Sequence, residues 1–222
     1  MAFRYAAAVR SQFPELVSRS LRIDGVDAAV DVTTAIGHFT AVATARLQGL
    51  AEGDLPEIQA WRRTFSKMGL KPTQYRCASE ALLRRFRKEG NLPSIHPLID
   101  LCNAVSLAYA LPIAVFDLDR VAGDLEVRPA HGDEVYLTFG GEVEHPEPGE
   151  IIFADDSGRA HARRWTNRQS GYSAIRPETR RALVVSEAMH EMASPDTTQL
   201  MADLRDALIT VWPAAIVSAG AD

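Results

Sequence analysis

The chain has 222 residues, of which 46% are hydrophobic and 24% are charged, and its formal net charge at pH 7 is −5. These values are ordinary for a globular protein with a sizeable core, and the negative charge argues against a general nucleic-acid binder. No apolar run approaches the roughly 20 residues that a membrane helix requires, and no signal-peptide pattern is found. We therefore expect a cytoplasmic protein that makes no membrane contact.

Two segments are strongly basic within this acidic chain. Residues 61–90 contain nine Lys and Arg against two Glu, and residues 159–181 contain seven Arg against one Glu. Such segments can bind a polyanion locally while the acidic remainder repels it, although runs of charge are usually solvated surface. Both interpretations stay open from the composition alone.

The first half of the chain predicts helices and short strands. We expect strands over 3–9 and 25–30 and helices over 12–21, 35–50 and 56–68. The next helix, over 79–89, has Ser79 as its expected N-cap and ends at Gly90. A further helix over 97–109 leads into a buried strand over 112–119.

The second half predicts mostly strands. Residues 124–130 and 134–141 alternate between apolar and polar, residues 149–165 form a hairpin with its turn at 156–158, and a strand follows over 181–187. An amphipathic helix over 194–212 closes the chain, with Ser194 or Asp196 near its cap. This order favours an α+β fold, a mixed β-sheet flanked by helices in a single compact domain. We divide it into an N-terminal strand and helix portion (1–58), a core (59–190) and a C-terminal helix and tail (191–222).

No motif for metal or cofactor binding is found. Cys77 and Cys102 lack metal-ligand spacing, the six His residues are scattered, and no phosphate-binding glycine motif or nucleophile elbow occurs. We expect no disulfide, no metal and no cofactor.

A polar stripe interrupts the apolar helix over 97–109. Asp100, Asn103 and Ser106 are three residues apart and therefore share one helical face. In one interpretation these side chains bind neighbouring backbone, as buried polar groups must. In the other they face a cavity, where the Asn103 amide can grip an ester carbonyl, an amino group or a ribose hydroxyl.

Two other segments carry candidate binding residues. In "RRWTNRQS", Asn167, Arg168 and Gln169 can hold phosphate or sugar while the aromatic side chain stacks on a base. The alternative for this segment is an Arg-rich sheet edge. In "QYRCASEALLRR", Arg76 and Ser79 precede a basic helix, and the simpler role for Ser79 is that of a helix cap.

The segment "PTQYRCASEALLRRFRKEGNLPSIHPLIDLCNAVSLAYALPIAVFDLD" is followed by "GDLEVRPA", "GEIIFADDSG" and "RRWTNRQSGYSAIRPET". Over residues 61–187 this series resembles the B3/B4 domain of the β subunit of bacterial phenylalanyl-tRNA synthetase. It resembles free-standing B3/B4-domain proteins even more. The resemblance implies a B3/B4-like core and the editing activity of that domain, which hydrolyses tRNA carrying the wrong amino acid without a metal or cofactor.

The resemblance also implies site residues. The synthetase pocket has a Thr-Asn pair that corresponds here to Cys102 and Asn103, a His where this chain has Ala114, and a Glu for which Glu187 is the nearest match. We therefore take Asn103 and Glu187 as candidate catalytic residues. The candidate substrate-binding residues are Asp100, Cys102, Ser106, Arg76, Ser79, Asn167, Arg168 and Gln169.

Three hypotheses follow for the function. The first is a deacylase, not a complete tRNA ligase, that acts in trans on the aminoacylated 3′ end of mischarged tRNA. The second is a tRNA or RNA-binding module without catalysis, and the third is a protein that binds an amino acid or another small metabolite. The Thr and His that this chain lacks favour the last two, whereas the polar stripe and "NRQS" favour the first two.

Overall fold

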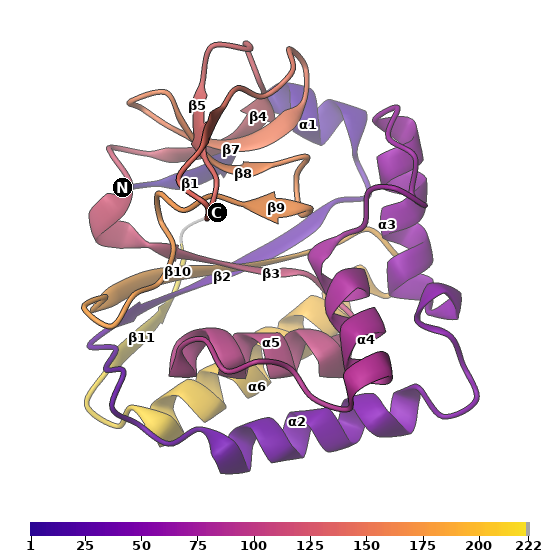
Figure 1. Ribbon diagram of the computed structural model, residues 1–222, viewed down its shortest axis with the longest axis vertical. Coiled ribbons are helices and arrows are strands. Elements are labelled where there is room, and N and C mark those ends of the chain that lie inside the picture. Colours follow the sequence, from indigo (N-terminus) through magenta and orange to yellow (C-terminus); the bar gives the residue numbers. More distant parts are fainter. Residues whose placement is uncertain (221–222) are drawn as a thin grey trace.

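The computed structural model describes residues 1–220 and arranges them in three layers (Figure 1). An upper sheet lies on a central sheet, and helices cover the other face of the central sheet. The expected α+β fold with a mixed sheet flanked by helices is confirmed, with the strands divided between two sheets. No helix in this part of the chain is both long and apolar enough to cross a membrane.

The upper sheet is the mixed one. Its strands pair in the order β1-β4-β7-β8-β5-β6, and β9 pairs with β8 outside this order. Two of the pairs are parallel, β1 with β4 and β5 with β8. The strand bounds are β1 (Phe3–Tyr5), β4 (Leu125–Pro129), β5 (Val135–Leu137), β6 (Val143–Glu144), β7 (Ile151–Asp155), β8 (Arg159–Arg163) and β9 (Arg168–Gln169).

The central sheet is antiparallel and has the order β11-β2-β10-β3. Its strands are β2 (Val17–Asp24), β3 (Ile113–Asp117), β10 (Arg181–Ala188) and β11 (Ile216–Ala219). The helical layer below it consists of α2 (Thr33–Arg46), α5 (Pro97–Tyr109) and α6 (Ala193–Val211). The remaining helices are α1 (Ala7–Gln12), α3 (Pro56–Lys67), α4 (Ala78–Glu89) and the short η1 (Glu52–Asp54) and η2 (Leu118–Arg120).

The central sheet separates two hydrophobic cores. Because side chains alternate along a strand, Leu183 and Val185 of β10 enter the core shared with the upper sheet, whereas Ala182 and Val184 enter the core shared with the helices. Every residue of β10 after Arg181 is buried. This strand therefore fixes which residues face the upper sheet and which face the helices.

The structure corrects several local predictions. The helix expected over 12–21 is instead the end of α1 and the strand β2, because Pro14 interrupts the helical backbone and β10 and β11 supply hydrogen-bonding neighbours on both sides. No strand forms over 25–30. The N-cap of α4 is Cys77, not Ser79. The closing helix α6 has Met192 as its N-cap, so Ser194 and Asp196 lie near the cap, in the first turn, as expected.

Two glycines, one at the end of a helix and one inside a helix, should respond in opposite ways to replacement by Ala. Gly90 ends α4 with φ of 76°, a left-handed conformation that costs a residue with a Cβ about 1 kcal/mol or more. Gly37 lies inside α2, and a Cβ there meets nothing within 4 Å. We expect Gly90→Ala to lower the free energy of unfolding by about 1 kcal/mol and Gly37→Ala to raise it by roughly 0.5–1 kcal/mol. Urea unfolding of both variants measures this, and equal effects of one sign contradict it.

Candidate functional site

A small cavity lies between the two sheets, and we call it the Glu187 pocket. Its volume is about 60 Å³. The walls come from β3, β7, β8, β9, β10 and the start of α4, and the lining includes Ala78, Ala114, Phe153, Ala162, Trp165, Asn167, Arg168, Gln169 and Glu187. Segments far apart in the sequence therefore converge here, and they include four of the candidate site residues.

Glu187 is a buried carboxyl group in this pocket. It is only 2% exposed and follows Leu183 and Val185 on the face of β10 that points to the upper sheet. Its Oε1 accepts hydrogen bonds from Tyr5 Oη and Trp165 Nε1, both at 2.7 Å, whereas Oε2 has no hydrogen-bond partner among residues 1–220. Burial raises the pKa of Glu187 to about 7, although these two donors and Arg10 act in the opposite direction. The group is thus able to take up or release a proton near neutral pH.

The backbone at Trp165 is strained. Arg164 and Trp165 have φ angles of 47° and 57°, in the left-handed region that residues with a Cβ rarely adopt. The Trp165 amide donates to the Ile151 carbonyl at 2.7 Å, and its indole packs edge-on against Trp61 at 5.3 Å. These contacts hold the indole N–H on Glu187. Such strain persists only where the surroundings enforce it, and it is common at functional sites.

The segment after Trp165 forms one wall of the pocket. Asn167 Nδ2 donates to the Arg76 carbonyl at 2.7 Å, and Gln169 Nε2 donates to the Val115 carbonyl of β3. Arg168 lies 3.1 Å from a carboxylate oxygen of Glu144, and its side chain is 39% exposed. Asn167 and Gln169 thus fix the segment, and Arg168 is the member of this trio with a charged group at the surface.

Arg76 and Ser79 lie beside this wall and do not line the cavity. The guanidinium group of Arg76 donates to the Thr73 carbonyl at 3.0 Å and lies 3.4 Å from Glu80. Ser79 is fully buried inside α4, where its Oγ is 3.4 Å from Cys77 Sγ. Arg76 therefore contributes to the pocket through its carbonyl group, which holds Asn167.

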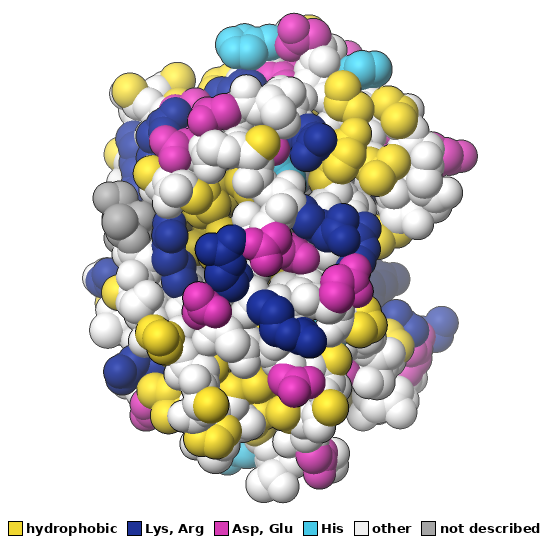
Figure 2. Space-filling view, turned by 90° about the vertical axis from the view of Figure 1, so that its left-hand side faces the viewer, with side chains coloured by type: hydrophobic (Ala, Val, Ile, Leu, Met, Phe, Trp, Pro, Cys, Tyr) yellow, Lys and Arg dark blue, Asp and Glu magenta, His cyan; other side chains and the backbone are white. Residues whose placement is uncertain are grey.

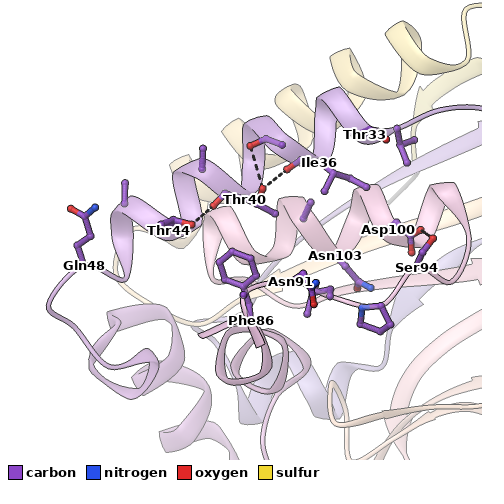
Figure 3. Close-up of a pocket in the computed structure, with 18 residues that line it drawn as sticks. Thr33, Ile36, Thr40, Thr44, Gln48, Phe86, Asn91, Ser94, Asp100 and Asn103 are labelled. Carbon is purple, nitrogen blue, oxygen red and sulfur yellow. Dashed lines mark hydrogen bonds between the residues drawn. The ribbon is translucent and has the colours of Figure 1, made fainter. Parts of the chain in front are cut away.

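The polar stripe of α5 lies on the other side of the central sheet. Asn103 and Asp100 line a groove of about 750 Å³ between α2, α5 and the loop after α4, which we call the Asn103 groove. Figure 3 shows Asn103 projecting from α5 toward the loop that carries Asn91 and Ser94. The Asn103 side chain is half-buried and makes no hydrogen bond to the described residues.

The other members of the stripe have local roles. Asp100 accepts hydrogen bonds from Ser94 Oγ at 2.7 Å and the Ile95 amide at 2.8 Å, which fixes the loop that precedes α5. Ser106 is 1% exposed and donates to the Leu111 carbonyl at 2.6 Å. Cys102 lies in the core below the central sheet, and burial raises the pKa of its thiol to about 12. Cys102 and Ser106 line neither cavity.

The central sheet is the physical reason why the candidate residues divide into two groups. Ala114 and Glu187 both lie on the Glu187 pocket, above this sheet, whereas Asn103 extends from a helix below it. Tyr5 and Trp165 were not among the candidate residues. Tyr5 gives no signal in the sequence, but Trp165 lies inside "RRWTNRQS", a segment that the sequence had singled out.

A buried Asp-His-Ser chain crosses the upper sheet without forming a catalytic triad. His161 lies 3.1 Å from Asp155 Oδ2 and 2.8 Å from Ser173 Oγ. His161 and Ser173 are 0% exposed, so a substrate cannot reach the hydroxyl group. Asp155 also accepts hydrogen bonds from the backbone amides of Ala122, Ser157 and Arg159. This chain of hydrogen bonds therefore stabilises the β7–β8 hairpin.

Many of the Arg side chains form ion pairs with carboxylates of the same chain. Arg62 lies 2.7 Å from Glu80, Arg87 lies 3.0 Å from Glu52, and Arg163 is held by Glu144 and Glu150. On the face drawn in Figure 2, Lys and Arg side chains alternate with Asp and Glu and do not form a continuous basic area. Fewer cations therefore remain for a polyanion than the sequence composition indicates.

A family model described as the B3/4 domain matches residues 60–204. The chain belongs to the B3/4 domain family. It is 28% identical over 162 residues to the phenylalanine–tRNA ligase β subunit of Photorhabdus laumondii, a match that covers 65% of this chain and 20% of that protein. The β subunit of Fusobacterium nucleatum is 31% identical over 103 residues, which cover 46% of this chain and 13% of that subunit.

The fold is also similar to a solved structure. A crystal structure of an N-terminal fragment of the phenylalanyl-tRNA synthetase β subunit from Pyrococcus horikoshii superposes with a TM-score of 0.53 at 9% identity. The match covers 97% of this chain and 50% of that fragment. In the sequence comparisons, this chain matches at most about a fifth of the length of the two curated relatives described above.

The raised pKa of Glu187 predicts a specific pH dependence of stability. The folded state binds the Glu187 proton more tightly than the unfolded chain, whose carboxyl group titrates near 4.5. Between pH 4.5 and 7 unfolding therefore releases a proton, and the free energy of unfolding falls as the pH rises, by about 3 kcal/mol in total. Glu187→Gln removes this loss, so the variant gains about 3 kcal/mol relative to the wild type between pH 4.5 and 8.

Urea unfolding at pH 4.5, 6 and 8 measures this difference. The control is Glu178→Gln, because the Glu178 side chain is 63% exposed. We expect the control to follow the pH profile of the wild type. Parallel profiles for Glu187→Gln and the wild type would contradict the prediction.

Proposed function

We propose that this B3/4 domain hydrolyses the ester bond of mischarged aminoacyl-tRNA in trans, in the Glu187 pocket. The observation that carries the proposal is the Glu187 carboxyl group. It is buried, its Oε2 has no hydrogen-bond partner in the described part of the chain, and its pKa of about 7 is suited to proton transfer at neutral pH. The family relatives are tRNA ligase subunits, which supports a tRNA substrate and a cytoplasmic location.

The chemistry needs no metal or cofactor. Glu187 in its ionised form accepts a proton from a water molecule whose oxygen attacks the ester carbonyl carbon. The proton then passes to the ribose oxygen as the carbon–oxygen bond of the ester breaks, and the free amino acid and tRNA leave. Trp165 and Tyr5 hold Oε1, so Oε2 is the oxygen left to receive the proton.

The size of the pocket favours a small amino acid. A volume of about 60 Å³ is far below the roughly 300 Å³ at which pockets for larger ligands begin. Ala114 stands where the synthetase motif has a His, and its methyl group offers no polar contact to a substrate side chain. A second site of this kind is useful because one methylene group gives a first site only about 10–200-fold discrimination.

The wall formed by Asn167, Arg168 and Gln169 is the proposed contact for the aminoacylated 3′ end. Its one exposed cation, Arg168, can contact a phosphate, and the internal ion pairs elsewhere make the remaining electrostatic attraction weak. We therefore propose a transient encounter with turnover in preference to tight binding. If the protein does not hydrolyse the ester, the alternative is that it binds tRNA or another RNA without catalysis.

A second candidate function is the binding of an amino acid or another small metabolite in the Asn103 groove. The groove has a volume of about 750 Å³, which is in the range of ligand pockets. Asn103 presents both donors and an acceptor there with no partner in the described residues. This function would use Asn103 and Asp100 and leave Glu187 without a role.

A panel of mischarged tRNAs tests the proposal. We expect the wild type to deacylate a tRNA carrying a small amino acid, at a rate that rises up to about pH 7 and then levels off. Glu187→Gln should reduce kcat by about 100-fold or more, as expected for loss of a general base. Asn103→Ala is the matched comparison and should retain the rate of the wild type.

The two variants together decide between the cavities. Loss of hydrolysis only in Asn103→Ala would move the chemistry to the Asn103 groove. Absence of hydrolysis of every pair by the wild type would contradict the deacylase proposal. Calorimetry with free amino acids then tests the second candidate function.

Arg168 gives a separate test of tRNA binding. Arg168→Gln removes one phosphate contact, so KM should rise several-fold with kcat unchanged, and the slope of log K against log salt should fall by about 1. Equal salt slopes for the wild type and Arg168→Gln would exclude this contact.

A further inference from the structure

Three residues from separate elements form a polar cluster below the central sheet. Glu57 lies in the first turn of α3, His190 follows the end of β10, and Asp196 lies in the first turn of α6. Each offers one ligand atom, and these three atoms lie within 4.8 Å of one another. We call these residues the Glu57 cluster. The positions 57, 190 and 196 show no spacing signal in the sequence, because the ligands meet only in the folded chain.

Two side chains of the cluster are buried and incompletely satisfied. Glu57 is 5% exposed and His190 is 9% exposed. Glu57 Oε2 and His190 Nδ1 are both buried atoms that have no hydrogen-bond partner among residues 1–220. Leaving a buried polar atom unpaired is destabilising, so two such atoms in one cluster indicate a partner that binds there.

The neighbouring contacts orient these ligands. Arg46 Nη2 donates to Glu57 Oε1 at 2.6 Å and leaves Oε2 free, and His190 Nε2 lies 2.8 Å from Asp196 Oδ2. A cavity of about 310 Å³ adjoins the cluster and is lined by Glu57, Asp196 and Asp203. Three carboxylates thus face one guanidinium group around this cavity, which favours a cation.

We propose that the Glu57 cluster binds a divalent transition-metal ion of the zinc or manganese type. One imidazole and two carboxylates are the ligands that such ions use, with the remaining positions filled by water from the cavity. Metal–ligand bonds of about 2.0–2.2 Å require the three side chains to close by roughly 1 Å around the ion. Arg46 then acts as the outer partner that fixes Glu57.

The ion would tie together the start of α3, the end of β10 and the start of α6. His190 lies three residues after Glu187, so the ion would also anchor the strand that carries the proposed proton-transfer group. Hydrolysis in the Glu187 pocket does not involve the ion chemically. This inference is therefore independent of the proposed function.

Metal titration of the full chain tests the proposal. The protein is purified without a polyhistidine tag, treated with chelator and dialysed, and then titrated by calorimetry with Zn²⁺ and Mn²⁺. We expect one ion per chain and a higher melting temperature with the ion than without it. Co²⁺ in place of Zn²⁺ should give visible absorption bands typical of nitrogen and oxygen ligands. Absence of binding of both Zn²⁺ and Mn²⁺ would overturn the proposal.

Variants identify the ligands. His190→Gln should weaken Zn²⁺ affinity by about 100-fold and Asp196→Asn by about tenfold, while His145→Gln, on the exposed surface of the upper sheet, should leave it unchanged. The Asp196 side chain is 37% exposed, so Asp196→Asn remains decisive even if His190→Gln fails to fold. Equal affinity of the wild type and Asp196→Asn, or weakening by His145→Gln as large as that by Asp196→Asn, would overturn the assignment.

Discussion

The burial of β10 on both of its faces is the constraint on which the rest of the structure depends. One face of the strand packs on the upper sheet and the other on the helices, so alternate residues enter two different cores. A strand of this kind is normally continuous in apolar residues. Glu187 breaks that rule, and the fold accommodates it with two neutral donors, Tyr5 and Trp165, in place of a cation.

That choice of partners sets the chemistry of the pocket. A guanidinium group beside Glu187 would favour the ionised carboxylate and lower its pKa, whereas two neutral donors only partly offset the cost of burial. The consequence is a carboxyl group that titrates near neutral pH, held by a Trp whose backbone is strained. Both features cost stability, because a buried carboxyl group and a left-handed backbone at residues with a Cβ are each unfavourable.

The basic residues have a more structural role than their number indicates. Arg163 is almost completely buried between Glu144 and Glu150, and Arg62 covers the buried Glu80. A buried carboxylate without such a partner would be strongly destabilising, so these pairs are required for folding. The charge that remains at the surface is mixed in sign, which is consistent with weak and salt-dependent contacts to a polyanion.

The sequence by itself determined the fold class, the helices α2 to α6 and the strands β3, β4, β5, β7, β8 and β10, because hydrophobic periodicity, Gly90 and the prolines are local signals. It did not predict the two-residue strands β6 and β9. It also determined the family, through the ordered motifs from residue 61 to 187. Only the tertiary structure decided that residues 17–24 form a strand, since their pairing partners lie about 160 residues away. It also decided that Asn103 and Glu187 occupy different cavities and that Tyr5 reaches Glu187. The physical reason is that spacing along a helix or strand fixes only which residues share a face, whereas the neighbour of that face depends on how the layers stack.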